Sequence, residues 1–175
     1  MMNIGIMGKI HSDGLDIFKK LGINFFEIDN FEKMFLIDKL KHVDGILLRT
    51  AKLDEEILSN CKNLKIVSRH GVGYDNVDSV YLNKNKIALA ITGTSNSISV
   101  AEHVMTMILN LTKNINKYDR LVKNGNFKKK YELGDFYELY KKKILIMGFG
   151  RIGKALAKRC LGFEMDVYVF DPYIE

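Results

Sequence analysis

The sequence contains little of what marks a membrane, secreted or disordered protein. Its 175 residues include no tryptophan, one proline and two cysteines. Cys61 and Cys160 are too few for a disulfide framework and form no short-range metal motif, which favours a reducing compartment. No apolar run approaches the ~18 residues that a membrane span needs, and the N-terminus lacks the pattern of a secretory signal. We therefore expect a cytoplasmic protein with no membrane partner.

What is present is an ordinary globular balance with an excess of positive charge. Hydrophobic residues make up 47% and charged residues 27% of the chain, which excludes disordered and low-complexity classes. The 27 Lys and Arg residues exceed the 21 Asp and Glu residues, for a net charge of +6. Much of the excess lies in two lysine triplets, at 128–130 and 141–143. No nucleic-acid-binding motif surrounds them, so we interpret them as solvated and expect no nucleic-acid partner.

Short apolar runs alternate with stretches of helical period in the first hundred residues. The apolar runs predict five strands, at 2–7, 23–28, 46–48, 64–68 and 87–91. The stretches between them predict helices at 15–21, 31–40 and 54–58. Buried strands separated by helices indicate a parallel sheet built from βαβ units.

The pattern changes in the second half of the chain. Ser99 and Glu102 have the spacing of a capping box, which predicts a helix from there to about Tyr118. Apolar residues cover most of the circumference of this helix, so we expect it to be buried on several sides, as between two domains or two subunits. The polar, lysine-rich residues 119–140 are expected to form an arm or loop.

A glycine motif stands between a predicted strand and a predicted helix. The G-x-G-x-x-G pattern consists of Gly148, Gly150 and Gly153, with an apolar run at 143–147 before it and a helical pattern at 154–161 after it. The first glycine allows a tight turn, the second lets the backbone approach a pyrophosphate, and the third lets helix and strand pack closely. The free N–H groups that begin the helix would then bind phosphate.

A carboxylate follows this motif at the expected distance. A strand predicted at 166–170 ends on Asp171, about 20 residues beyond the glycines. Asp171 would accept hydrogen bonds from an adenosine ribose and would repel a 2′-phosphate, so we expect NAD rather than NADP. The alternative is that Asp171, which precedes Pro172, is a turn residue only.

Over essentially its whole length the sequence resembles the D-isomer-specific 2-hydroxyacid dehydrogenases, with the D-3-phosphoglycerate dehydrogenase branch most similar. The resemblance rests on the segments 48–52, 64–78, 96–103, 148–153 and 170–172. It implies an α/β fold in which a flavodoxin-like parallel-sheet substrate domain precedes the first β-α-β unit of a Rossmann dinucleotide-binding domain. We assign residues 1–96 to the substrate domain and residues 97–175 to the start of an incomplete NAD-binding domain.

The resemblance also implies the roles of individual cofactor-binding residues. Arg151 and Ile152 would lie under the pyrophosphate, and Asp171 would hold the adenosine ribose. Val72 would lie where the substrate turn meets the nicotinamide.

The same resemblance implies where a substrate acid would bind. The N–H groups of Val72 and Gly73, in the turn that begins at Gly71, would bind the substrate carboxylate. Arg49 and Arg69 match positions near the active cleft, where a planar guanidinium suits a phosphate. The alternative for both arginines is a surface salt bridge at a strand end.

The catalytic residues that the resemblance implies have no counterpart in this sequence. The Arg, His and Glu that act in hydride transfer belong to later strands of the dinucleotide domain. Of the four histidines present, His11, His42, His70 and His103, only His70 lies beside the substrate turn, and we interpret it as an ordinary loop residue. We therefore assign no catalytic residue and no metal ligand.

The predicted function is that of an NAD-dependent oxidoreductase of D-2-hydroxy acids, free or phosphorylated. This chain would be a truncated or split N-terminal portion of such an enzyme, inactive by itself, with a second copy (a homodimer) or a complementary chain as its partner. The alternative is a non-catalytic module that binds NAD or another protein.

Overall fold

The computed structural model describes residues 2–174 and divides into two compact units, Met1–Ser95 and Asn96–Glu175. Each unit has its own hydrophobic core.

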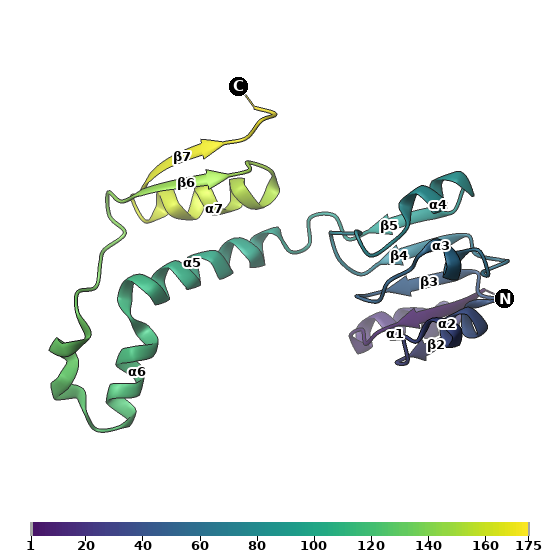
Figure 1. The fold of residues 1–175 in the computed structure, drawn as a ribbon, viewed down its shortest axis with the longest axis horizontal. Helices are drawn as coiled ribbons and strands as arrows, with labels where there is room; N and C mark the ends of the chain where they lie inside the picture. Colours follow the sequence, from purple (N-terminus) through teal and green to yellow (C-terminus); the bar gives the residue numbers. More distant parts are fainter. Residues whose placement is uncertain (1, 175) are drawn as a thin grey trace. The chain divides into compact units, whose positions relative to one another are not determined.

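The first unit is built around a five-stranded parallel sheet (Figure 1). Its strands are β1 (Asn3–Met7), β2 (Asn24–Ile28), β3 (Gly45–Leu48), β4 (Ile66–Arg69) and β5 (Ala88–Ile91). They lie in the order β2-β1-β3-β4-β5, and every neighbouring pair is parallel. The prediction of a parallel sheet with the flavodoxin-like strand order is confirmed.

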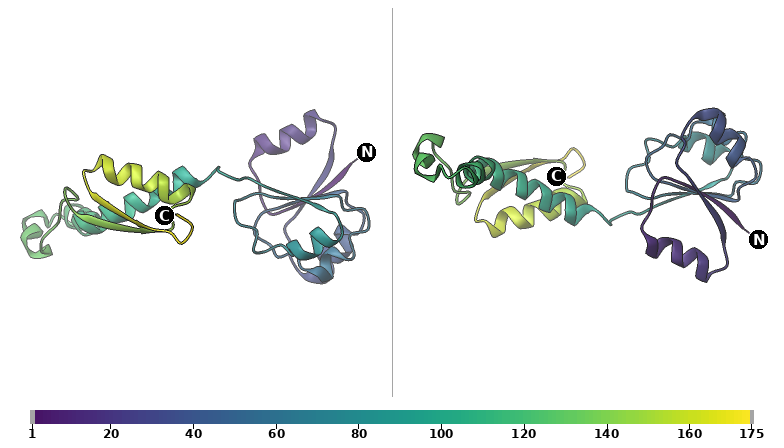
Figure 2. Two further views of the ribbon diagram at one scale, coloured as in Figure 1. Left: turned by 90° about the horizontal axis from the view of Figure 1, so that it is seen from above. Right: turned by 90° about the horizontal axis from the view of Figure 1, so that it is seen from below.

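Helices cover both faces of this sheet. They are α1 (Ser12–Lys20), α2 (Lys33–Leu40), α3 (Glu55–Leu58) and α4 (Ser79–Lys84). Figure 2 shows α1 on one face and α2 and α4 on the other. The main core lies under α2, α3 and α4, where one leucine-rich layer is buried against the sheet: Leu36, Leu40, Leu58, Leu82, Ile46, Leu48 and Val67.

Two details of these helices differ from the prediction. Helix α1 begins at Ser12 rather than at residue 15, because the His11 side chain accepts a hydrogen bond from the Asp13 N–H and caps the first turn. Helix α4 has no counterpart among the predicted helices. The Asp78 carboxylate caps it by accepting a bond of 2.9 Å from the Tyr81 N–H.

The second unit begins with helices and ends with a β-α-β segment. Its elements are α5 (Ser97–Lys113), α6 (Ile115–Lys123), the 3-10 helix η1 (Phe127–Leu133), β6 (Lys143–Met147), α7 (Arg151–Gly162) and β7 (Asp166–Phe170). Strands β6 and β7 pair in parallel. Helix α7 packs on α5 around a small core that includes Ala101, Met105, Ile146, Leu156 and Cys160. An ion pair of 2.8 Å between Arg159 and Glu102 joins the same two helices.

The expected start and end of α5 are wrong. The helix begins at Ser97, so Ser99 and Glu102 lie inside it and form no capping box; Glu102 binds Arg159 instead. The helix ends at Lys113 because Asn114 adopts a left-handed backbone, with φ of 51°. The segment expected to be an arm or loop is therefore partly helical, in α6 and η1.

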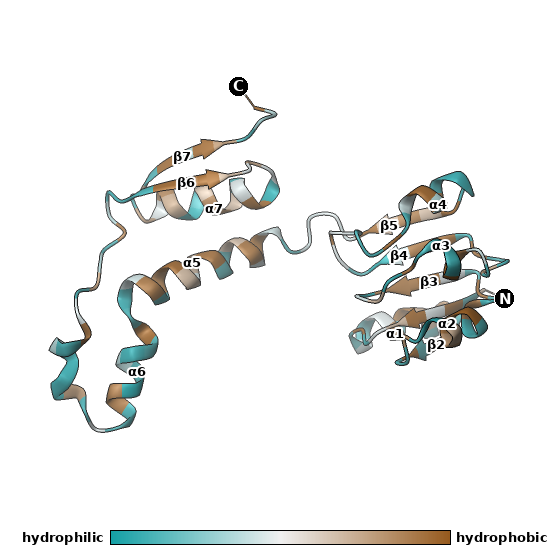
Figure 3. Ribbon diagram, in the orientation of Figure 1, coloured by the Kyte–Doolittle hydropathy of each residue, from teal (hydrophilic) through white to brown (hydrophobic). Residues whose placement is uncertain are grey.

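Inside the second unit α5 is buried on one side, and its expected burial between two domains or two subunits stays a prediction. Within the described part of its unit, Ala101 and Met105 are the residues of α5 that are buried. Figure 3 shows apolar residues repeated along the whole helix, and Met107 and Leu111 among them are exposed. The unit therefore covers one side of an apolar helix and leaves another side open.

The sheet of the second unit has an open apolar face as well. Ile146 belongs to the small core that includes residues of α7, and Ile144 and Val167 pack against it. Figure 1 shows α7 lying along this two-stranded sheet. Because side chains alternate along a strand, the intervening residues point to the opposite face. They are large, apolar or aromatic, and exposed: Leu145, Met147, Tyr168 and Phe170.

Candidate functional site

The carboxyl ends of β3 and β4 bring two of the predicted segments to one edge of the first unit. Leu48 and Arg69, the last residues of these strands, are register partners. Arg49 and His70 follow them, and the His70 N–H donates a bond of 2.7 Å to the Leu48 carbonyl. Since parallel α/β sheets bind ligands at the carboxyl ends of their strands, these residues lie where a small ligand would bind.

Directly after β4, the turn Gly71-Val72-Gly73 presents main-chain donors. The Gly71 N–H donates to the Arg69 carbonyl at 2.8 Å, and the Gly71 carbonyl accepts from Thr92 at 3.1 Å. In contrast, the N–H groups of Val72 and Gly73 donate to no oxygen of residues 2–174. Two neighbouring free N–H groups in a partly exposed turn can bind the two oxygens of one carboxylate.

The Arg69 guanidinium lies across this turn. Its Nε donates to Asn76 Oδ1 at 3.4 Å, and its Nη1 donates to the His70 carbonyl. The guanidinium occupies the space that a Cβ at position 71 would take, so a side chain there would displace the flexible end of Arg69. Within the described chain neither Arg69 nor Arg49 forms an ion pair. The alternative prediction of surface salt bridges is therefore wrong for both.

Arg49 lines a hollow of about 610 Å³ at the carboxyl ends of β1, β2 and β3. Its Nη1 donates to the Lys9 carbonyl at 2.9 Å, and Lys9 lines the same hollow together with Glu27 and Asp29. A guanidinium has five N–H donors, so the exposed Arg49 has donors left for an anion. Lys9 was not predicted from the sequence, because it belongs to no motif.

In the second unit, the glycine turn has the geometry that the motif predicts. Gly148 has a φ of 93°, which disfavours any side chain, and its N–H donates to the Phe170 carbonyl at 2.7 Å. A Cβ at Gly153 would lie 2.1 Å from the Gly148 carbonyl oxygen. At Gly150 a Cβ would meet no atom within 4 Å. The turn is thus tightly packed on the side of Gly153 and open at Gly150.

The first turn of α7 has no capping side chain. The N–H groups of Arg151, Ile152 and Gly153 donate to no described protein atom. The helix dipole adds partial positive charge at the same place. Free donors beside the open position at Gly150 fit a pyrophosphate.

Asp171 follows β7 and is bonded to the glycine turn. Its Oδ2 accepts from the Phe149 N–H at 2.6 Å, and its Oδ1 accepts from the Tyr173 N–H at 2.9 Å. The second bond is the turn interaction that the alternative predicts, whereas the first joins the carboxylate to the glycine motif. A carboxylate has about four acceptor positions, so two remain open. They lie beside a hollow of about 270 Å³ that Phe149, Val169 and Ile174 also line.

Acid should disrupt the bond between Asp171 and the glycine turn only at low pH. The N–H groups of Phe149 and then Tyr173 lower the pKa of the Asp171 carboxyl below 3.8, and Lys154 adds to this effect. Because the pKa is lower in the folded state, the stabilisation is present above the unfolded pKa and is lost as the pH falls through the folded one. We expect the Phe149 amide signal in NMR spectra to titrate with a midpoint below 3.8. An Asp171→Asn variant should lack this titration, and a midpoint above the ordinary value would contradict the geometry.

The other reactive groups of the described chain form no catalytic set. The His70 side chain is exposed and forms no hydrogen bond or ion pair with residues 2–174. Burial raises the pKa of the Cys61 thiol to about 11, so it stays protonated at neutral pH. Residues 2–174 contain no group of three or more side chains that could hold a metal ion. None of their helices is both long enough and apolar enough to cross a membrane.

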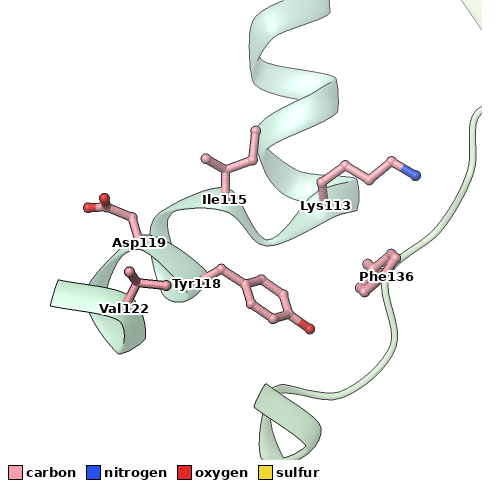
Figure 4. A pocket seen from close by; sticks show the side chains of 6 residues that line it. All are labelled: Lys113, Ile115, Tyr118, Asp119, Val122 and Phe136. Atoms are coloured by element: carbon pink, nitrogen blue, oxygen red, sulfur yellow. The ribbon is translucent and has the colours of Figure 1, made fainter. Parts of the chain in front are cut away.

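A further hollow of about 600 Å³ lies beside α6, outside both motifs (Figure 4). The residues that line it are mostly apolar or aromatic: Lys113, Ile115, Tyr118, Asp119, Val122 and Phe136. The Tyr118 and Phe136 rings meet edge to face, with centroids 6.0 Å apart. This composition suits contact with another apolar surface better than acid–base chemistry.

Comparisons with known sequences agree with the resemblance. A family model described as "D-isomer specific 2-hydroxyacid dehydrogenase, catalytic domain" matches residues 4–165. The chain is 32% identical over 174 residues to a D-3-phosphoglycerate dehydrogenase of Archaeoglobus fulgidus. It is 34% identical over 175 residues to one of Bacillus subtilis. Both alignments cover 99% of this chain and 33% of the relative, so the chain spans about a third of the length of these curated relatives.

Solved structures give the same result for the fold. A D-lactate dehydrogenase from Aquifex aeolicus, complexed with NAD and lactic acid, matches 99% of this chain with a TM-score of 0.85 and 27% identity. A 3-phosphoglycerate dehydrogenase of Entamoeba histolytica with bound NAD+ matches 99% with a TM-score of 0.78 and 29% identity. The matches cover 52% and 55% of those chains.

Proposed function

The chain belongs to the D-isomer-specific 2-hydroxyacid dehydrogenase family, and on this premise we propose that its two units carry two half-sites of an NAD-dependent oxidoreductase. In this proposal residues 1–96 bind a D-2-hydroxy acid or the matching 2-oxo acid, and residues 97–175 are the opening of the dinucleotide-binding domain. NAD, when bound, supplies a nicotinamide ring that exchanges a hydride with C2 of the acid.

The substrate half-site is the turn after β4. The N–H groups of Val72 and Gly73 bind the substrate carboxylate, with Gly71 giving the close approach. Arg69 adds positive charge at the turn, and Arg49 binds a second anionic group such as a phosphate. One observation carries this assignment: two free N–H donors lie in the turn that the Arg69 guanidinium crosses, and neither Arg69 nor Arg49, at the end of the neighbouring strand, has a carboxylate partner in the described chain.

The cofactor half-site is the turn between β6 and α7. The glycine turn and the N–H groups of Arg151 and Ile152 hold the pyrophosphate, and Asp171 accepts hydrogen bonds from the adenosine ribose. Val72, on the first unit, contacts the nicotinamide. The open position at Gly150 and the two unoccupied acceptor positions of Asp171 support the assignment. The negative charge of Asp171 favours NAD over NADP.

The proposal assigns no catalytic acid or base to this sequence, so we expect no dehydrogenase turnover from the chain alone. It includes a protein partner, either a second copy or a complementary chain. Three exposed apolar surfaces support a partner: the open side of α5, the open face of β6 and β7, and the hollow in Figure 4. Contiguous apolar surface of this kind is typical of protein contacts.

Calorimetric titration of the chain with NADH tests the cofactor half-site. We expect saturable binding, and we expect Asp171→Ala to weaken it by about tenfold to a hundredfold, because hydrogen bonds to a charged acceptor contribute about 1.5–3 kcal/mol each. Asp166→Ala is the matched control, since this exposed carboxylate on β7 forms no side-chain bond within the described residues. A folded chain that binds no NADH would refute the cofactor assignment.

The absence of an assigned acid and base favours one alternative, a non-catalytic module that binds NAD or another protein. The two functions differ in their response to a complementary polypeptide that carries the later strands of the family's dinucleotide domain. The oxidoreductase should gain turnover on mixing. The module should bind NADH equally well without that polypeptide and gain no activity from it.

A further inference from the structure

One side chain, that of Asn76, joins the substrate turn to the loop that begins with Arg49. Its Nδ2 donates to the Ala51 carbonyl at 2.7 Å, two residues beyond Arg49. Its Oδ1 accepts from Arg69 Nε at 3.4 Å, and the Arg69 guanidinium lies against Gly71. A single half-buried amide therefore bonds to both segments that the proposed function assigns to the substrate.

The main chain around Asn76 holds that amide in place. The Leu53 N–H donates to the Asn76 carbonyl at 2.8 Å, and the Asp78 N–H donates to the Leu53 carbonyl at 2.9 Å. Leu53 and Val77 form a short parallel bridge, and both side chains are buried. The backbone of residue 76 is thus anchored beside the buried Leu53, and its side chain adds the bonds to Ala51 and to Arg69.

We propose that Asn76 is a positioning residue, which holds Arg49 at a set distance from the N–H groups of Val72 and Gly73. An acid with an anionic group at each end can then bind Arg49 and the N–H groups of Val72 and Gly73 at the same time. Neither the loop of Arg49 nor the substrate turn has to rearrange for this. Asn76 itself does not touch the acid. This inference rests on the proposed substrate site and goes beyond it, since it names what fixes the spacing of the two anion-binding groups.

Two ligands that differ in their number of anionic groups distinguish a positioning role of Asn76 from a general role in stabilising the fold. D-Glycerate carries a carboxylate only, whereas D-3-phosphoglycerate carries a carboxylate and a phosphate. The dissociation constant of D-glycerate divided by that of D-3-phosphoglycerate measures how much affinity is gained when the phosphate binds at Arg49 in addition to the carboxylate at Val72 and Gly73. We expect the wild-type chain to bind phosphoglycerate at least tenfold more tightly, and we expect Asn76→Ala to reduce this ratio about fivefold or more. Chemical shifts of the Val72 and Gly73 amides in 15N NMR spectra report both titrations.

Asn85→Ala is the matched control. The Asn85 Nδ2 also donates to a backbone carbonyl, that of Tyr81, at 2.9 Å, but the bond lies at the end of α4 and reaches neither loop. This variant should lose a comparable hydrogen bond and keep the wild-type ratio. If Asn76→Ala fails to fold, Asn76→Ser replaces it, because the shorter side chain cannot reach Ala51 while it leaves a polar group at the site.

The possible results distinguish this inference from the proposed function. A lowered ratio in a folded Asn76 variant, with the Asn85 control unchanged, supports positioning. An Asn76 variant with the wild-type ratio overturns the inference, and so does a wild-type ratio near one. Neither result contradicts the proposed carboxylate site. If neither ligand moves the Val72 and Gly73 signals of the wild-type chain, the proposed substrate site is wrong and the inference fails with it.

Discussion

Replacing Gly153 with alanine should abolish dinucleotide binding and destabilise the second unit. The added Cβ would lie 2.1 Å from the carbonyl oxygen of Gly148 and 3.1 Å from its carbon. Both are backbone atoms, so the glycine turn must move away from α7 to admit the methyl group. Overpacking of this kind costs about 1–3 kcal/mol. We expect NADH affinity to fall more than about a hundredfold in calorimetric titrations, since the turn and the helix N-terminus would no longer meet the same phosphates.

Two other glycines provide controls. A Cβ at Gly162, at the end of α7, would meet no atom within 4 Å, so Gly162→Ala should bind NADH normally and gain up to about 1 kcal/mol of stability. Gly150→Ala should fold normally for the same steric reason and yet lose NADH binding, because its methyl group would take the space of a phosphate. Wild-type binding by Gly153→Ala would contradict the assigned role of the turn.

Replacing Arg49 with alanine should weaken D-3-phosphoglycerate binding by about tenfold to a hundredfold and leave D-glycerate binding within about threefold. The phosphate would lose charge-assisted bonds of about 1.5–3 kcal/mol, whereas the carboxylate would still bind at the Val72 and Gly73 N–H groups. The stability of the first unit should change little, because the Arg49 side chain is exposed and forms one hydrogen bond to a backbone carbonyl.

Charge-matched variants complete this test. Arg49→Lys keeps the charge but not the planar fork, so we expect an intermediate loss. Arg120→Ala removes the same charge from the exposed surface of α6 and should leave both acids unaffected. Equal weakening of both acids by Arg49→Ala would place this residue at the carboxylate instead of the phosphate.

The glycine motif is the part of the site that sequence predicts best. Its requirements are local and follow from the path of the chain between a strand and a helix. Gly148 has a positive φ, and its carbonyl lies so close to Gly153 that no side chain fits there. The turn at Gly71 was also found from sequence, through the resemblance. The close approach of the Arg69 guanidinium to this glycine became visible only in the structure.

Features that depend on distant residues were not predicted. The capping box failed because α5 begins at Ser97, two residues before Ser99, and the ion pair that Glu102 forms instead joins it to Arg159, 57 positions away. Asn76 was missed for the same reason: its bond to Ala51 spans 25 positions, and no periodicity encodes it. The end of α5 is different, since asparagine is a known residue for a left-handed helix stop. Asn114 was thus a local signal that could have placed the end of this helix.

The two cores described above share no residue: one lies under the five-stranded sheet and the other between α5 and α7. For such a chain a single free energy of unfolding is not a defined quantity. A ligand raises the melting temperature only of the part that it binds in the native state. We therefore expect a 2-hydroxy acid to shift the heat-capacity peak of the first unit, and NADH to shift chiefly that of the second, so that a single calorimetric scan reports on both half-sites.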